Sequence, residues 1–302
     1  MAPCGCLWPT RPPTVLAAGG DFYDALTLGD GRAAFILGDV CGHGRRALAR
    51  TAFVRYTLRA YIEAGLQPRH ALQVAGVVID EHMGGEFATV AVHDSAAGSL
   101  TYACAGHPPP IVAGPSRPEA VLAGASPPVG LGLRTGPRQT TVALPPGSVV
   151  CLYTDGLAEA RVDDGILGRP RLGDMIDELG QKATAPLLLQ RVAQEARLIT
   201  DDMAALILMP TAGVTTGGFG SEQLEVDAGD VADGLPERFL RACGCSAEQA
   251  EVATAELRTA LPRHGSAVLD IAYGIGEPTV RVEAGPAQSG PGPTLTSILP
   301  VF

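Results

Sequence analysis

Apolar residues follow two spacings along this chain, and each spacing predicts a different kind of element. A continuous apolar run over residues 33–40 is typical of a buried strand, and it ends at Asp39. Over residues 45–64 the apolar side chains recur every three or four positions, which predicts an amphipathic helix with Gly65 as its stop signal. A second helix is predicted from residue 68 to about residue 83.

Short strands then follow in quick succession. They are predicted at residues 87–92, 100–105, 111–113, 140–144 and 149–153, with turn residues between them. Helical patterns return at about residues 171–179 and 185–199, before a strand at residues 203–209. Short connections favour antiparallel neighbours, because parallel strands need long crossovers. Strands in runs with helices grouped apart indicate an α+β fold.

Composition narrows the class of protein. Hydrophobic residues make up 46% of the 302 residues, enough for a sizeable core, and no apolar stretch approaches the roughly 20 residues of a membrane span. The N-terminus lacks the pattern of a signal peptide, so we expect a cytoplasmic protein whose seven scattered cysteines are reduced. A net charge of −10 argues against nucleic acid and acidic membranes as partners.

Acidic residues stand at the edges of the apolar runs, most of them beside glycine. They are Asp21, Asp24, Asp39, Asp155, Asp201 and Asp202. A carboxylate at a strand end is held by the sheet yet still reaches solvent, so several strand ends can focus oxygen ligands on one point. Magnesium, manganese and calcium prefer such ligands. Each motif alone could equally mark a turn, because Asp-Gly pairs are common connectors.

These acidic segments, in this order, resemble the bacterial SpoIIE-type branch of the metal-dependent (PPM) protein serine/threonine phosphatases. Further parts of the resemblance are Phe-Ala-Thr-Val at residues 87–90, AGHPPP at 105–110 and LYTDGLAEAR at 152–161. The resemblance covers residues 15–210. It implies a four-layer αββα sandwich of two antiparallel sheets flanked by helices.

The resemblance also implies the site. Asp39 would bridge two Mn2+ or Mg2+ ions and the backbone carbonyl of Val40 would add a ligand, while three further carboxylates would complete the second metal's shell. Those three are Asp21, Asp155 and Asp201. Asp24 and Asp202 could be ligands or could orient ligands, and Asp155 could instead cap the turn that follows it.

His43 lies in a glycine-flanked loop after Asp39. A titrating imidazole there could protonate the leaving seryl or threonyl oxygen. A loop histidine before a helix could equally serve as a structural hydrogen-bonding residue.

The rest of the chain divides into four parts: an N-terminal extension at residues 1–14, a linker at 211–220, a small α/β unit at 221–285 and a flexible Gly/Pro-rich tail at 286–302. Residues 256–265 resemble a helix of the anti-sigma-factor kinases, which are histidine-kinase-like ATPases. Ala260 stands where that family has its magnesium-holding asparagine, Pro262 should break the helix, and the adenine-reading aspartate motif is absent. The unit therefore reads as a degenerate relic that binds no nucleotide, or as a partner-docking module.

Two functions follow from these patterns. The first is an active phosphatase for phosphoserine or phosphothreonine, whose substrate by resemblance is a phosphorylated anti-anti-sigma factor. The second is a catalytically weak pseudophosphatase that binds regulatory partners. An anti-sigma partner or a homodimer contact could also control the first function, by shifting the helix after Asp39 and so changing metal affinity.

Overall fold

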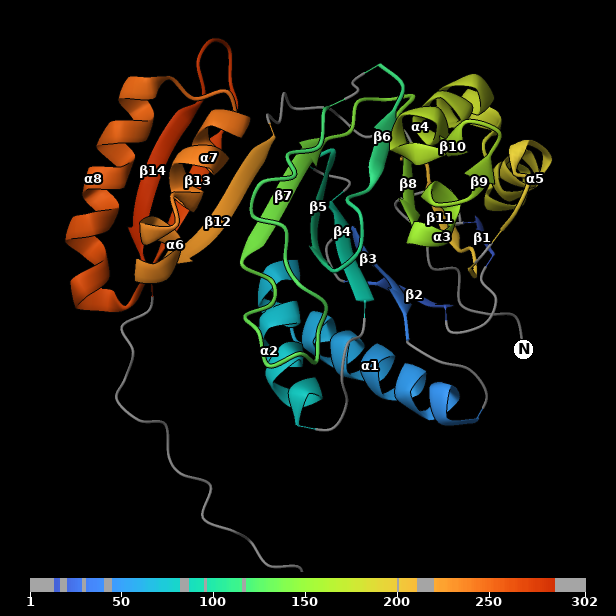
Figure 1. Ribbon diagram of the computed structural model, residues 1–302, viewed down its shortest axis with the longest axis horizontal. Helices are drawn as coiled ribbons and strands as arrows, with labels where there is room; N and C mark the ends of the chain where they lie inside the picture. The colour runs from blue at the N-terminus through green and yellow to red at the C-terminus, as the bar shows by residue number, and fades with distance from the viewer. Residues whose placement is uncertain are drawn as a thin grey trace, which may run out of the picture.

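The computed structural model describes residues 14–16, 21–28, 31–40, 45–81, 87–94, 97–115, 118–199, 201–210 and 220–285. Two antiparallel sheets lie face to face, and helices cover the outer face of each (Figure 1). The layer order is therefore αββα, which confirms the fold expected from the sequence.

The larger sheet has eight strands in the order β14-β13-β12-β7-β5-β4-β3-β2, and every neighbouring pair is antiparallel. Its strands are β2 (Asp21–Thr27), β3 (Arg32–Asp39), β4 (Phe87–Asp94), β5 (Ser99–Ala105), β7 (Arg138–Ala143), β12 (Ser221–Asp227), β13 (Ser266–Ala272) and β14 (Thr279–Ala284). Helices α1 (Arg45–Glu63) and α2 (Pro68–Asp80) pack on one face of it.

The smaller sheet has four antiparallel strands in the order β1-β11-β8-β6. They are β1 (Thr14–Leu16), β11 (Ala205–Leu208), β8 (Val149–Tyr153) and β6 (Ile111–Ala113). Its outer face carries α3 (Asp155–Ala158), α4 (Gly168–Leu179), a 3-10 turn η1 (Gly180–Lys182) and α5 (Ala185–Glu195). A short hairpin of β9 (Arg161–Val162) and β10 (Gly165–Ile166) follows α3.

The continuous apolar run at residues 33–40 arises because strand β3 is buried on both faces. Its side chains alternate between the two faces of the sheet, and both faces are covered. Ala34 and Ile36 pack against the helices α1 and α2, whereas Phe35 and Leu37 pack against the smaller sheet. Burying a large apolar side chain such as Phe35, Ile36 or Leu37 contributes about 1.5–3 kcal/mol, so β3 is anchored from both sides as far as Leu37, two residues before Asp39.

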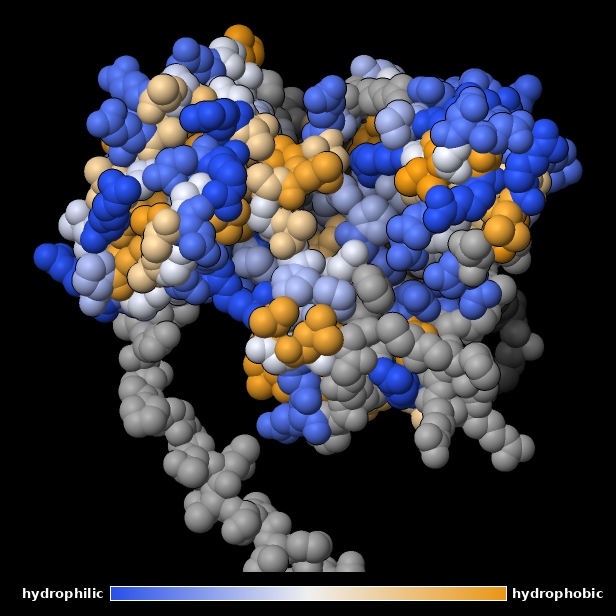
Figure 2. All heavy atoms as spheres, viewed as in Figure 1, coloured by the Kyte–Doolittle hydropathy of each residue, from blue (hydrophilic) through white to orange (hydrophobic). Residues whose placement is uncertain are grey.

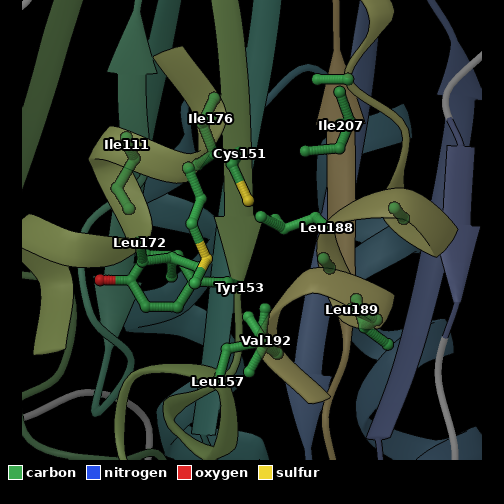
Figure 3. Packing of buried hydrophobic residues seen from close by; sticks show 14 of the residues in the cluster. Ile111, Cys151, Tyr153, Leu157, Leu172, Ile176, Leu188, Leu189, Val192 and Ile207 are labelled. Atoms are coloured by element: carbon green, nitrogen blue, oxygen red, sulfur yellow. The ribbon is translucent and has the colours of Figure 1, made fainter. Parts of the chain in front are cut away.

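A second buried apolar cluster fills the space between the outer face of the smaller sheet and its helices. Figure 3 shows Tyr153 and Cys151 of β8 pointing toward Ile176 and Leu172 of α4 and toward Leu188 and Val192 of α5. Leu157 of α3 lies below them in the same cluster. The strand that leads to Asp155 is thereby held rigidly.

The C-terminal unit is continuous with the larger sheet of the sandwich. Strand β12, which the sequence analysis did not predict, pairs with β7 over four residues from Ser221 opposite Thr141 to Leu224 opposite Arg138. Helices α6 (Ala228–Ala232), α7 (Leu235–Ala242) and α8 (Ala247–His264) cover the face of β12–β14 (Figure 1). The preceding linker at residues 211–219 and the tail at 286–302 lie outside the described residues.

Buried polar pairs reinforce this junction. The Arg138 guanidinium donates to the Glu222 carboxylate at 2.9 and 3.0 Å, and the Thr140 hydroxyl donates to the same oxygen at 2.7 Å. On the other face, Glu225 accepts from Arg69 of α2 at 3.1 Å. Figure 2 shows apolar side chains gathered around the hollow between the C-terminal unit and the rest, where a cavity of about 520 Å³ lies beside β7 and β12.

Most predicted elements are present with shifted ends. The predicted helix break at Pro262 is wrong, because α8 continues through this residue to His264. Proline in a last turn removes one backbone hydrogen bond without stopping the helix, since little helix remains beyond it. Among the described residues, no helix is long and apolar enough to cross a membrane.

Candidate metal centre

Asp21 and Asp39 face each other at one end of the larger sheet. Asp21 begins β2, Asp39 ends β3, and the two residues are direct partners in the antiparallel register. Asp39 shares the face of Phe35 and Leu37, which points at the smaller sheet. The next pair is Phe22 opposite Gly38, and a Cβ at Gly38 would lie 2.2 Å from the Phe22 ring. The close packing that glycine permits therefore fixes the two strands beside the carboxylates.

The smaller sheet supplies the other three carboxylates. Asp155 directly follows β8 as the first residue of α3, and Asp201 and Asp202 precede β11, which pairs with β8. Gly156 lies against this segment, since a Cβ there would be only 2.0 Å from the Asp202 carbonyl oxygen. The Asp155 side chain accepts a hydrogen bond from the amide of its neighbour Gly156 at 3.0 Å, and the N-cap position of α3 is Thr154 rather than Asp155.

Like charges accumulate around Asp21. Burial, reinforced by the negative charges of Asp39, Asp202 and Asp201, raises the pKa of Asp21 to about 8. A hydrogen bond from Thr154 opposes this rise only in part. The fold therefore brings Asp39, Asp201 and Asp202 within electrostatic reach of Asp21, although Asp201 and Asp202 are far from Asp21 in sequence.

Thr154 is a site residue that the sequence analysis missed. Its hydroxyl lies 3.4 Å from Asp21 Oδ2, and its side chain is buried where β8 meets β11. The signal available in the sequence was its place directly before Asp155 in the LYTDG segment.

Asp24 has a different role from the other carboxylates. It is three residues beyond Asp21 and faces the helical layer, where it is 5% exposed. It accepts from Arg55 at 3.1 Å and from Arg59 at 3.3 and 3.4 Å, both on α1. Asp24 therefore links β2 to α1, on the sheet face opposite to the carboxylate cluster formed by Asp21, Asp39, Asp201 and Asp202.

The roles predicted for the other site residues, Val40, Asp155 and His43, are not tested by the structure. The Val40 side chain is buried under α1 and α2, and the ligand role of its carbonyl stays a prediction, as does the ligand role of Asp155. His43 lies outside the described residues. Within the described part of the chain, no three Asp, Glu, His or Cys side chains are close enough together to form a ready-made metal-binding group.

A hard divalent cation nevertheless fits the chemistry of this site. The donors are carboxylate oxygens, which Mg2+ and Mn2+ prefer, and these cations usually keep several waters in addition to a few protein ligands. Burial is the largest cause of the raised pKa of Asp21, and the neighbouring carboxylates add negative charge that a bound cation would neutralise.

Comparisons with known proteins agree with this arrangement. The family profile described as stage II sporulation protein E (SpoIIE) matches residues 29–210. Protein IcfG from Synechocystis sp. (strain ATCC 27184 / PCC 6803 / Kazusa) is 28% identical over 184 residues, which cover 51% of this chain and 29% of that protein. The chain thus spans less than a third of this curated relative.

Solved structures share the fold. The RsbU and RsbW domains of Rv1364c from Mycobacterium tuberculosis match with a TM-score of 0.59 and 23% identity, covering 88% of this chain and 81% of that one. The SiaA-PP2C domain of Pseudomonas aeruginosa gives a TM-score of 0.56 at 22% identity, covering 65% and 85%. The PP2C phosphatase domain and regulatory fragment of SpoIIE from Bacillus subtilis give 0.55 at 17% identity, covering 66% and 64%.

The profile match covers more than half of the chain and includes Asp39, Asp155, Asp201 and Asp202, while the structures share the sandwich that brings these carboxylates toward Asp21. This chain therefore belongs to the SpoIIE family and has the fold of PP2C phosphatase domains.

Proposed function

We propose that this protein is a metal-dependent serine/threonine phosphatase that hydrolyses phosphoserine or phosphothreonine on a regulatory protein. The observation that carries the proposal is the convergence of Asp39, Asp201 and Asp202 on Asp21 at one edge of the sandwich, where burial and these three charges raise the pKa of Asp21. Membership of the SpoIIE family supports the same reaction class.

The chain's own residues have separable tasks in this proposal. Asp21, Asp39 and Asp201 would hold two Mn2+ or Mg2+ ions, together with Asp155 and the carbonyl of Val40. Bound divalent ions neutralise the phosphate dianion and lower the pKa of water. The rigid ends of β3 and β8 keep the carboxylates in place, so little reorganisation is needed when the phosphoester arrives. His43 is the candidate proton donor to the leaving oxygen.

The substrate we propose is a phosphorylated anti-anti-sigma factor in the cytoplasm, with an anti-sigma factor as a further partner. Similarity to the RsbU and RsbW domains of Rv1364c and to the cell fate determinant SpoIIE supports this class of partner. The C-terminal unit is proposed to be a degenerate histidine-kinase-like unit. Titration of the full chain with Mg-ATP should then give no binding heat, and micromolar binding would contradict this assignment.

The test of the phosphatase uses p-nitrophenyl phosphate and a phosphoserine peptide, each with and without Mn2+. Wild-type protein should hydrolyse both only with the metal, and Asp39→Ala should lose this activity while keeping its circular dichroism spectrum. Asp233→Ala is the matched control, because Asp233 is an exposed aspartate at the end of α6 in the C-terminal unit. Full activity of Asp39→Ala would refute the assignment.

A pseudophosphatase is the second candidate. It is favoured by the C-terminal unit, in which Ala260 stands at the position of the kinase family's magnesium-holding asparagine and whose strand β12 joins the larger sheet. The two candidates separate in the same assay, because a pseudophosphatase would bind phosphoprotein but show no hydrolysis at any Mn2+ concentration.

A further inference from the structure

Thr154 occupies the point where the two sheets meet at the carboxylate cluster. It follows the last residue of β8, and its backbone amide donates to the Ala204 carbonyl at 3.1 Å. The Ala204 amide returns a hydrogen bond to the Thr154 hydroxyl at 2.9 Å. These reciprocal bonds fix the threonine to the residue just before β11.

The same hydroxyl reaches across to the other sheet. It lies 3.4 Å from Asp21 Oδ2 on β2 and 3.5 Å from the Ala204 carbonyl oxygen. A hydroxyl has one hydrogen to donate and can accept two. Since the Ala204 amide already uses it as an acceptor, the hydrogen is available for Asp21, and a carboxylate is a stronger acceptor than a neutral carbonyl.

We propose that Thr154 is a positioning residue, which orients the Asp21 carboxylate toward the ligands from the smaller sheet and so sets the affinity of the site for its divalent cation. This inference rests on the proposed metal-dependent function and deepens it. Asp21 belongs to the edge strand β2, whose outer side has no neighbouring strand in the described part of the sheet. An edge strand is held by a neighbouring strand on one side only, so the contact from Thr154 on the other sheet restricts the movement of Asp21.

The location of Thr154 supports this role over a purely structural one. It is 1% exposed, it directly precedes Asp155, and Ala204 is two residues beyond Asp202. One side chain therefore connects the segments that carry all the smaller sheet's carboxylates to Asp21. The hydroxyl also accepts from the Ala204 amide, so its contact with Asp21 Oδ2 is what distinguishes a positioning role from a structural bond within the smaller sheet.

The experiment compares Thr154→Val, which has the same shape but no hydroxyl, with Thr154→Ser, which keeps the hydroxyl. The first readout is Mn2+ affinity of the full chain by calorimetry, which does not depend on turnover. We expect Thr154→Val to weaken Mn2+ binding about 10-fold or more, as for other residues that orient metal ligands, and Thr154→Ser to restore it to within about threefold.

Thr135→Val is the matched control for lost stability. Thr135 is also buried and its hydroxyl donates to a backbone carbonyl, that of Leu72 at 3.3 Å, but it lies in the loop beside α2. It should lower the melting temperature without changing Mn2+ affinity. If Thr154→Val does not fold, Thr154→Cys gives the same comparison, because a thiol is a weaker donor and acceptor of similar size.

Kinetics supply the second readout. At saturating Mn2+, kcat of Thr154→Val should stay within a few-fold of wild type while the Mn2+ concentration for half-maximal rate rises. In an Asp21→Asn background the Thr154→Val change should add little, because the two residues act through one contact.

Wild-type Mn2+ affinity in Thr154→Val, or an equal loss in Thr135→Val, would overturn the positioning role and leave the phosphatase assignment intact. Failure of the wild-type protein itself to bind Mn2+ or to hydrolyse phosphoester would instead remove the proposed function on which the inference rests.

Discussion

Replacing Gly156 by alanine tests whether the position of Asp202 and Asp201 controls the site. Gly156 lies in α3 with an ordinary helical conformation, so alanine is acceptable to the backbone and only the added methyl group matters. That methyl carbon would lie 2.0 Å from the Asp202 carbonyl oxygen, whereas real Cβ contacts are almost never shorter than 3.0 Å. The segment before β11 must therefore move by about 1 Å or more, because the obstacle is backbone.

A displacement of this size costs about 100-fold in a catalytic rate when it misplaces reacting or ligating groups. Overpacking should also lower the free energy of unfolding by about 1–3 kcal/mol. The assay is Mn2+-dependent hydrolysis of p-nitrophenyl phosphate, with urea unfolding measured in parallel. The control is Gly274→Ala, since a Cβ at Gly274 meets nothing within 4 Å. If Gly156→Ala retained wild-type kcat and Mn2+ affinity, the reasoning that these carboxylates form the site would fail.

Three further predictions concern stability. Asp24→Asn should lower the free energy of unfolding by about 2 kcal/mol in urea titrations, by weakening charged hydrogen bonds to α1, yet change Mn2+ affinity less than threefold. Glu222→Gln should cost about 3 kcal/mol, because it leaves the Arg138 charge buried without its partner, while Asp163→Asn in an exposed ion pair should change the unfolding midpoint very little. Burial lowers the pKa of His107 to about 3, below the ordinary 6.5. Because the unfolded chain then binds a proton that the folded protein excludes, the free energy of unfolding should fall as the pH drops from 6.5 toward 3, by about 2 kcal/mol at pH 5. His107→Gln should flatten this part of the plot of unfolding free energy against pH.

Much of the sandwich could be predicted because its strands are buried on both faces or bounded by strong turn signals. The run at residues 33–40 and the strand at residues 149–153 were found for this reason. β12 was missed because Leu224 and Val226 are its only apolar residues, while a glutamate occupies the remaining inward position. That glutamate, Glu222, becomes an acceptable core residue only when Arg138 lies beside it, and the sequence of β12 alone does not reveal its partner.

Motif order identified the candidate carboxylates, and the structure adds the spatial arrangement that local sequence cannot supply. The clustering of Asp21 with Asp39 depends on the β2–β3 register, and that with Asp202 depends on how the two sheets stack. Asp24 differed because strand alternation turns it to the helical face, where α1 presents two arginines. The contact of Thr154 with Asp21 joins residues 133 positions apart, so it follows only from the assembled fold.

The pairing of β12 with β7 makes the boundary between the two halves of this molecule a shared set of backbone hydrogen bonds. A swinging hinge is therefore not available to the C-terminal unit, since any rigid-body rotation would tear the sheet. Cutting the chain after residue 210 would leave β7 with an open edge, and open edges recruit strands from other molecules. A shortened protein should consequently self-associate, and a mechanical pull on the C-terminus should be transmitted through β7 to the strands that end at the carboxylates.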